Sequence, residues 1–172
     1  MRTRSSSRTR PAGIRRPQGS ALGAGLRLLG RRAHSRVEMQ RKLARRGYTP
    51  EEVDSALARL DELGYLNDLS FAEGLVRLRS ASRGPRAVSA ELAQRGVGRA
   101  QADSALASYN DALQMASATR IIERTYGKRE ITGYREMLDR VGSKLQRLGF
   151  STTIVRAACH AVMAGPPPDA EA

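Results

Sequence analysis

The strongest constraint on the fold is a pattern that occurs three times along the chain. Each copy has two apolar residues four positions apart, a glycine four positions later, and an apolar residue directly after the glycine. The copies are Met39-Leu43-Gly47-Tyr48, Val88-Leu92-Gly96-Val97 and Val141-Leu145-Gly149-Phe150. A second apolar set follows each glycine at matched offsets: Val53, Ala56, Leu57; Ala102, Ala105, Leu106; and Val155, Ala158, Cys159. Three such copies predict an internal repeat.

The repeated pattern is typical of two helices joined at a glycine. Apolar residues four apart share one helix face, and glycine is favoured where a helix ends in a left-handed residue. In the first copy the second helix has a clear start, because Thr49 can cap, Pro50 suits the first position and Glu52 completes a capping box. The helix before it has Ser35 as its cap and Glu38 three residues later.

Further helices are predicted between the copies. Asp68 is a good N-cap for a helix that Gly84-Pro85 ends, with three apolar residues on one side: Phe71, Leu75 and Leu78. Apolar residues between 109 and 126 indicate one long helix or two short ones. Upstream of the first copy, three leucines form a short apolar stripe: Leu22, Leu26 and Leu29. No segment shows the period-two alternation of a strand, so eight or nine helices are expected.

The fold class predicted is all-α, an elongated array of three tandem three-helix repeats, each with a small core. The repeats are expected at residues 21–66, 67–112 and 113–163. They are flanked by a disordered basic tail at 1–20 and a proline-rich disordered tail at 164–172.

The net charge of +13 is concentrated at one end of the chain. Residues 1–46 contain fourteen Lys and Arg but one acid, Glu38, whereas the other 126 residues contain sixteen basic and sixteen acidic groups. Such a segment attracts a polyanion, either nucleic acid or an acidic protein surface. Genomic bias is the alternative, since Arg outnumbers Lys 27 to 3. Bias explains the choice of Arg over Lys but not the scarcity of acids.

The sequence favours a cytoplasmic protein. A single cysteine, Cys159, excludes an internal disulfide and indicates a reducing compartment. No run approaches the roughly 18 apolar residues of a membrane span. An organellar transit peptide is the alternative interpretation of the Arg/Ser-rich residues 1–20, but a disordered tail is favoured.

Two stretches resemble the signature motifs of the RecX family. The central one is Leu63-Gly-Tyr65-Leu-Asn67-Asp68-Leu-Ser-Phe71-Ala72-Glu73, continuing through Val76-Arg77-x-Arg79 to Arg83-Gly84-Pro85 and Glu91-Leu92-x-x-Arg95-Gly96. The upstream one is Leu29-x-x-Arg32-x-x-Ser35-x-x-Glu38-x-x-x-Lys42-Leu43-x-x-Arg46-Gly47-Tyr48. The resemblance spans roughly residues 22–162. The arginine-rich N-terminus departs from the family pattern, so nothing is carried over to residues 1–20.

The resemblance implies a regulator of the RecA recombinase that acts by binding and needs no cofactor. Its partner would be RecA, especially the RecA filament on single-stranded DNA. It would inhibit filament extension, ATPase activity and strand exchange, in homologous recombination, DNA repair and the SOS response. The protein is expected to be a monomer with at most weak direct DNA binding and no membrane association.

Two sets of basic residues are candidate contacts with the filament or its DNA. The first set lies around the first repeat: Arg31, Arg32, Arg36, Arg41, Lys42, Arg45 and Arg46. If residues 36–46 are helical, its last four members lie away from Met39 and Leu43. The second set lies in and after the connecting helix: Arg77, Arg79, Arg83 and Arg86. The alternatives are a solvated face for the first set, and salt bridges to Glu73 or Glu91 for the second.

Catalysis and metal binding have little support in the sequence. Cys159 occupies the apolar slot of Leu57 and Leu106, so it is expected in the core. His34 and His160 give no metal-ligand spacing, and neither a phosphate loop nor a nucleophile motif occurs. Asp68 and Phe71 match the family signature, but an N-cap and a core anchor explain them. We therefore expect neither an enzyme nor a metal site.

Two other functions fit the same helices. A helix–glycine turn–helix unit is also found in helix-turn-helix proteins that bind DNA directly. The other alternative is a structural adaptor for a different acidic protein.

Overall fold

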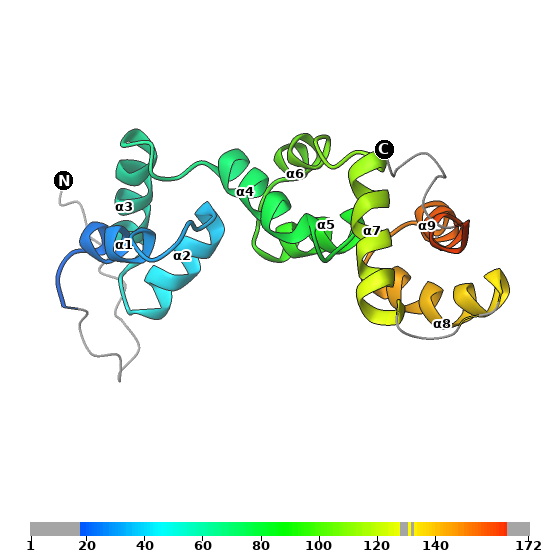
Figure 1. Cartoon of the computed structure of the whole chain (residues 1–172). Helices are drawn as coiled ribbons and strands as arrows, with labels where there is room; N and C mark the ends of the chain where they lie inside the picture. The colour runs from blue at the N-terminus through cyan, green and yellow to red at the C-terminus, as the bar shows by residue number, and fades with distance from the viewer. Residues whose placement is uncertain (1–17, 128–130, 132, 165–172) are drawn as a thin grey trace, which may run out of the picture. The chain divides into compact units, whose positions relative to one another are not determined.

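The structure, a computed structural model, describes residues 18–127, 131 and 133–164. Over these residues the chain forms nine α-helices and no strand, which confirms the predicted all-α class (Figure 1). Most of the two predicted tails, residues 1–17 and 165–172, lies outside the described residues.

The helices form three consecutive groups of three, called repeats 1, 2 and 3 below. Repeat 1 contains α1 (Ala21–Leu29), α2 (Arg36–Arg45) and α3 (Pro50–Glu62). Repeat 2 contains α4 (Asp68–Ser80), α5 (Pro85–Gln94) and α6 (Arg99–Leu106). Repeat 3 contains α7 (Asp111–Tyr126), α8 (Tyr134–Arg147) and α9 (Thr152–Ala164).

All three repeats share one internal packing scheme. The first helix of each repeat packs along the third, and the second helix packs on the third as well (Figure 1). Each repeat encloses its own cluster of buried apolar residues. The chain divides into two compact units, Met1–Leu66 and Asn67–Ala172, so repeats 2 and 3 share a unit. Tandem helical repeats are therefore present as predicted.

The repeated glycine has the conformation that its position predicts. Gly47, Gly96 and Gly149 end the second helix of their repeats with φ values of 87°, 78° and 93°. Few residues other than glycine adopt this left-handed region without strain. The residue after each glycine then enters the core, where Tyr48 is 6% exposed and Phe150 is fully buried.

The paired apolar residues before the glycines form the centre of each core. All six are fully buried: Met39, Leu43, Val88, Leu92, Val141 and Leu145. The set that follows each glycine is buried too, except that Leu106 is only partly buried. Cys159 lies in this set with no exposed surface, as predicted. Cys159 is packed as a small apolar side chain, and this burial raises the pKa of its thiol.

Two of the three predicted helix starts are confirmed, and one is displaced by a residue. Thr49 and Glu52 form the capping box before α3, and the Ser35 hydroxyl accepts from the Glu38 amide at 3.1 Å. Asp68, however, is not the cap of α4. The cap is Asn67, whose side chain accepts from the Ser70 amide at 2.9 Å, so Asp68 becomes the first helical residue.

Each of two predicted apolar stripes contains one residue that the structure exposes, Leu26 in α1 and Leu78 in α4, whereas the other members pack against or lie in the core. In α1 the buried residues are Ala21, Ala24, Gly25 and Leu28, while Leu26 is 39% exposed. Small residues form this face because α1 lies close to α3, where a Cβ on Gly25 would come within 2.8 Å of the Leu60 side chain. In α4, Leu78 is 68% exposed, and Ala72 and Val76 complete the buried face instead.

Repeats 2 and 3 are joined by direct contact between their backbones. The Gly84 amide donates to the Leu148 carbonyl at 2.8 Å, and the Arg86 amide donates to the Gly149 carbonyl at 3.2 Å. A Cβ on Gly84 would lie 2.4 Å from backbone atoms of Gly149 and Phe150. Only glycine therefore fits at position 84, although its φ of −79° is open to any residue. We call this contact the Gly84–Gly149 joint.

We predict that Gly84→Ala lowers the free energy of unfolding by about 1–3 kcal/mol, because the new methyl group must displace backbone atoms. The matched control is Gly74→Ala in α4, where the nearest atom to a new Cβ is the Arg77 guanidinium at 3.9 Å. The control should gain about 0.5–1 kcal/mol from helix propensity. Urea unfolding followed by circular dichroism measures both, and equal midpoints for the two variants would contradict the steric argument.

His34 is buried between α1 and α2 with 4% of its surface exposed. Its Nδ1 lies 2.8 Å from the Arg32 carbonyl oxygen, so the neutral ring donates a hydrogen bond there. Burial lowers its pKa from the ordinary 6.5. The hydrogen bond to the Arg32 carbonyl and the charge of Glu38 oppose this shift, and the charges of Arg32 and Lys42 add to it.

This shift predicts a stability loss in mild acid. Above the ordinary pKa of 6.5 the ring is neutral in both states, whereas below it the unfolded chain binds a proton that the folded protein disfavours. The unfolding free energy should therefore decrease as the pH falls from about 7.5 to about 5.5. His34→Asn, which keeps a donor, should remove that part of the decrease, and His160→Asn at an exposed position should not. Urea titrations at both pH values decide the matter.

Candidate partner-binding surface

Four basic residues near the end of α2 form a feature that we call the basic ridge: Arg41, Lys42, Arg45 and Arg46. The helix buries Met39 and Leu43 on its opposite side, and both have no exposed surface. The three arginines are exposed, whereas Lys42 is half-buried. The ridge therefore has the orientation predicted from the helix period.

The cations of repeat 1 differ in what they contact. Arg36 pairs with Asp61 of α3 at 2.7 Å. Arg32 binds Glu38 through both terminal nitrogens, and this hydrogen bond raises the pKa of its guanidinium. The only acid among the first 46 residues is thereby occupied.

The remaining basic residues of repeat 1 are less constrained. Among the described residues, no carboxylate pairs with Arg31, Lys42, Arg45 or Arg46. Arg46 reaches only the Lys42 carbonyl, at 3.4 Å. Exposed cations without acid partners retain their full charge for an anionic ligand. Arg45 and Arg46 of the basic ridge are therefore well placed for such a ligand.

In the second candidate set (Arg77, Arg79, Arg83 and Arg86), Arg79 differs from the other three because it pairs with Glu91. Arg79 binds Glu91 of α5 through two nitrogens, at 2.9 and 3.0 Å, and Glu91 also accepts from Arg95 at 2.7 Å. Arg79 chiefly, together with Arg95, holds the pKa of Glu91 below its usual range. Arg79 therefore links α4 to α5 through the salt bridge to Glu91 that the sequence offered as the alternative to partner binding. Arg77, Arg83 and Arg86 are exposed.

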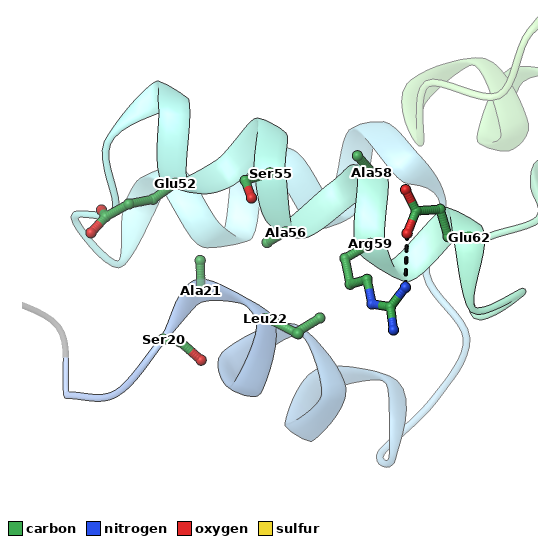
Figure 2. Close-up of a pocket in the computed structure, with 9 residues that line it drawn as sticks. All are labelled: Ser20, Ala21, Leu22, Glu52, Ser55, Ala56, Ala58, Arg59 and Glu62. Carbon is green, nitrogen blue, oxygen red and sulfur yellow. Dashed lines mark hydrogen bonds and ion pairs between the residues drawn. The ribbon is translucent and has the colours of Figure 1, made fainter.

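A groove of about 510 Å³ lies between α1 and α3 (Figure 2). Its lining includes Ala21, Leu22 and Ala56, with two glutamates at its edge. One, Glu62, pairs with Arg59 at 2.9 Å, and the other, Glu52, accepts from the Thr49 amide in the capping box. The lining contains no histidine or cysteine. Its two serines are Ser20, which caps α1, and Ser55.

No group of three His, Cys, Asp or Glu side chains among the described residues has the geometry of a metal site. No helix among the described residues is long and apolar enough to cross a membrane. His160 is exposed, and its ring meets the Tyr134 ring edge-on at 6.1 Å.

Two arginines of interest were not singled out as candidates from the sequence. Arg95 matches a RecX motif, but its role as a second partner of Glu91, with its guanidinium 5.9 Å from the Phe71 ring, depends on how α4 and α5 pack. Arg147 is exposed at the end of α8, directly before the residues that form the Gly84–Gly149 joint. Its Nε donates to the Ser143 carbonyl of its own helix at 3.2 Å, and no local motif marks it.

Known proteins resemble this chain in both sequence and fold. The family model for the first three-helix domain of RecX matches residues 21–60, and that for the second matches residues 67–106. A crystal structure of RecX from Lactobacillus salivarius is similar with a TM-score of 0.74 at 24% identity, covering 81% of this chain and 92% of that one.

Curated relatives align over most of their length. A regulatory protein RecX of Halorhodospira halophila is 44% identical over 140 residues, covering 80% of this chain and 85% of its own. One from Stenotrophomonas maltophilia strain K279a is 37% identical over 149 residues, covering 84% and 88%. The chain belongs to the RecX family of regulatory proteins.

Proposed function

We propose that this protein binds the filament that the RecA recombinase forms on single-stranded DNA and inhibits its extension, ATPase activity and strand exchange. It does so as a cytoplasmic, non-enzymatic monomer. The observation that carries the proposal is the basic ridge of a RecX family member, on a helix whose opposite side is fully buried. A filament on DNA presents phosphates, and exposed cations such as Arg45 and Arg46, which pair with no carboxylate among the described residues, attract them over about 10 Å at moderate salt.

Rigidity of the scaffold supports a binding role. The basic ridge ends at Arg46, directly before Gly47, and the capping box of α3 begins two residues after that glycine. Met39 and Leu43 are fully buried in the close-packed core, which restrains the backbone under the cations. Cations at fixed positions lose less entropy on binding than cations on a mobile segment.

Direct binding of duplex DNA in a helix-turn-helix manner is less well supported. In that arrangement the helix after the turn, α3, would enter the groove. All five acids of α3 are exposed: Glu51, Glu52, Asp54, Asp61 and Glu62. Phosphates on both sides of a groove would repel such a helix, although Arg36 and Arg59 offset part of its negative charge by pairing with Asp61 and Glu62.

The proposal predicts that the purified protein inhibits the DNA-dependent ATPase of RecA at less than one molecule per recombinase. Arg45→Gln/Arg46→Gln should raise the concentration that gives half-inhibition by about fivefold or more, because two exposed charge contacts are each worth roughly 0.5–1 kcal/mol. Half-inhibition is read from the rate of ATP hydrolysis at saturating single-stranded DNA.

The control double variant is Arg59→Gln/Arg99→Gln, which removes two exposed arginines that already face carboxylates. It should inhibit like the unmodified protein. Absence of inhibition by the unmodified protein at any ratio would reject the proposed function. If both double variants change the concentration for half-inhibition equally, only the role of the basic ridge is rejected, and contact with another acidic partner is favoured.

A further inference from the structure

The Gly84–Gly149 joint brings two short segments of different repeats side by side. The turn before α5 and the first residues of α5 supply one segment, residues 81–90, and the end of α8 with its following turn supplies the other, residues 143–151. Two backbone hydrogen bonds link them, at 2.8 and 3.2 Å, and the glycines leave no room for a side chain between the backbones. Side chains next to these glycines are thereby held at the same part of the surface.

These two segments carry positive charge and no negative charge. They contain four basic residues and neither Asp nor Glu: Arg83, Arg86, Lys144 and Arg147. Lys144 is directed toward α7, with its Nζ 3.3 Å from the Thr125 hydroxyl and 5.7 Å from the Tyr126 ring. The three arginines are exposed, and none pairs with a carboxylate among the described residues.

The same surface lacks the apolar centre of a protein–protein contact. Neither segment contains a large exposed apolar residue, and its one aromatic, Phe150, is fully buried. Protein interfaces are usually built around apolar and aromatic side chains. Phosphates instead need charge and planar donors, and the guanidinium group provides both. The absence of an exposed aromatic also leaves no platform for base stacking, so contacts here are to the backbone of the nucleic acid.

We infer that Arg83, Arg86 and Arg147 form a phosphate-binding surface for a nucleic-acid strand, organised by the Gly84–Gly149 joint between repeats 2 and 3. This inference deepens the proposed function and rests on it for the source of the strand, the DNA of the filament. It adds repeat 3 to the binding surface through Arg147. It also gives Gly84 a positioning role, because the joint sets the spacing of the three guanidinium groups.

The test measures binding of the full-length protein to a fluorescent single-stranded oligothymidine by anisotropy, from about 50 to 200 mM salt, without the recombinase. Arg147→Gln should weaken binding about threefold or more and reduce the slope of log K against log salt by about 0.7, the loss of one phosphate contact. The matched control, Arg135→Gln, removes an exposed arginine twelve residues earlier on α8, about 18 Å away. It should change neither quantity.

Two further variants test the surface as a unit. The triple variant Arg83→Gln/Arg86→Gln/Arg147→Gln should reduce the slope by about 2. Gly84→Ala keeps every charge but disturbs the joint, so it should weaken binding as Arg147→Gln does. Its helical content is checked first by circular dichroism, and if it does not fold, the comparison of Arg147→Gln with Arg135→Gln decides.

Three results would overturn the inference. In the first, the unmodified protein does not bind the oligonucleotide at 50 mM salt. In the second, Arg147→Gln and Arg135→Gln change binding equally. In the third, poly-glutamate displaces the oligonucleotide as readily as unlabelled oligonucleotide does. The last result would assign the surface to an acidic protein. Inhibition of RecA that persists in a variant that no longer binds the oligonucleotide would leave the proposed function intact and reject only the assignment of this surface to the DNA of the filament.

Discussion

The left-handed glycine turn between the second and third helices of each repeat is the constraint on which the rest of the structure depends. A positive φ at Gly47, Gly96 and Gly149 reverses the chain sharply enough for the next residue to enter the core. The third helix can then start within a few residues and pack against both earlier helices. Tyr48 adds a polar link, because its hydroxyl lies 3.2 Å from the Gly19 carbonyl and so ties the turn to the start of α1.

The third copy of this turn has a second role, at the contact with repeat 2. A Cβ on Gly149 would lie 2.4 Å from the Ala87 amide nitrogen, so glycine is required there both for its φ of 93° and for the approach of repeat 2. The Tyr109 hydroxyl supports the same region, because it donates to the Ser80 and Arg83 carbonyls at 2.8 and 3.0 Å. Arg83 therefore lies on a backbone that is held from both sides.

Periodicity and cap chemistry are local signals, and they predicted most of the fold. Buried pairs such as Val141 and Leu145, the capping box of Thr49, and the position of Cys159 all follow from residues within one or two helical turns. The displaced cap at Asn67 shows the usual one-residue uncertainty where two good caps are adjacent. The errors at Leu26 and Leu78 have another cause. Which face of a short helix is buried depends on how closely its neighbour approaches, and this is a tertiary property.

The same distinction limits what the sequence indicates about the binding surface. Arg79 and Arg83 are one helical turn apart and look equivalent in the sequence, yet Arg79 is held by Glu91 while Arg83 lies in a segment without acids. Charge alone therefore marks which residues are able to contact a polyanion, and tertiary packing determines which of them remain available. In the first 46 residues acids are so scarce that most of the cations remain available, so the basic ridge was visible from the sequence. In repeats 2 and 3 acids are common, and only the backbone joint identifies the place where cations gather without them.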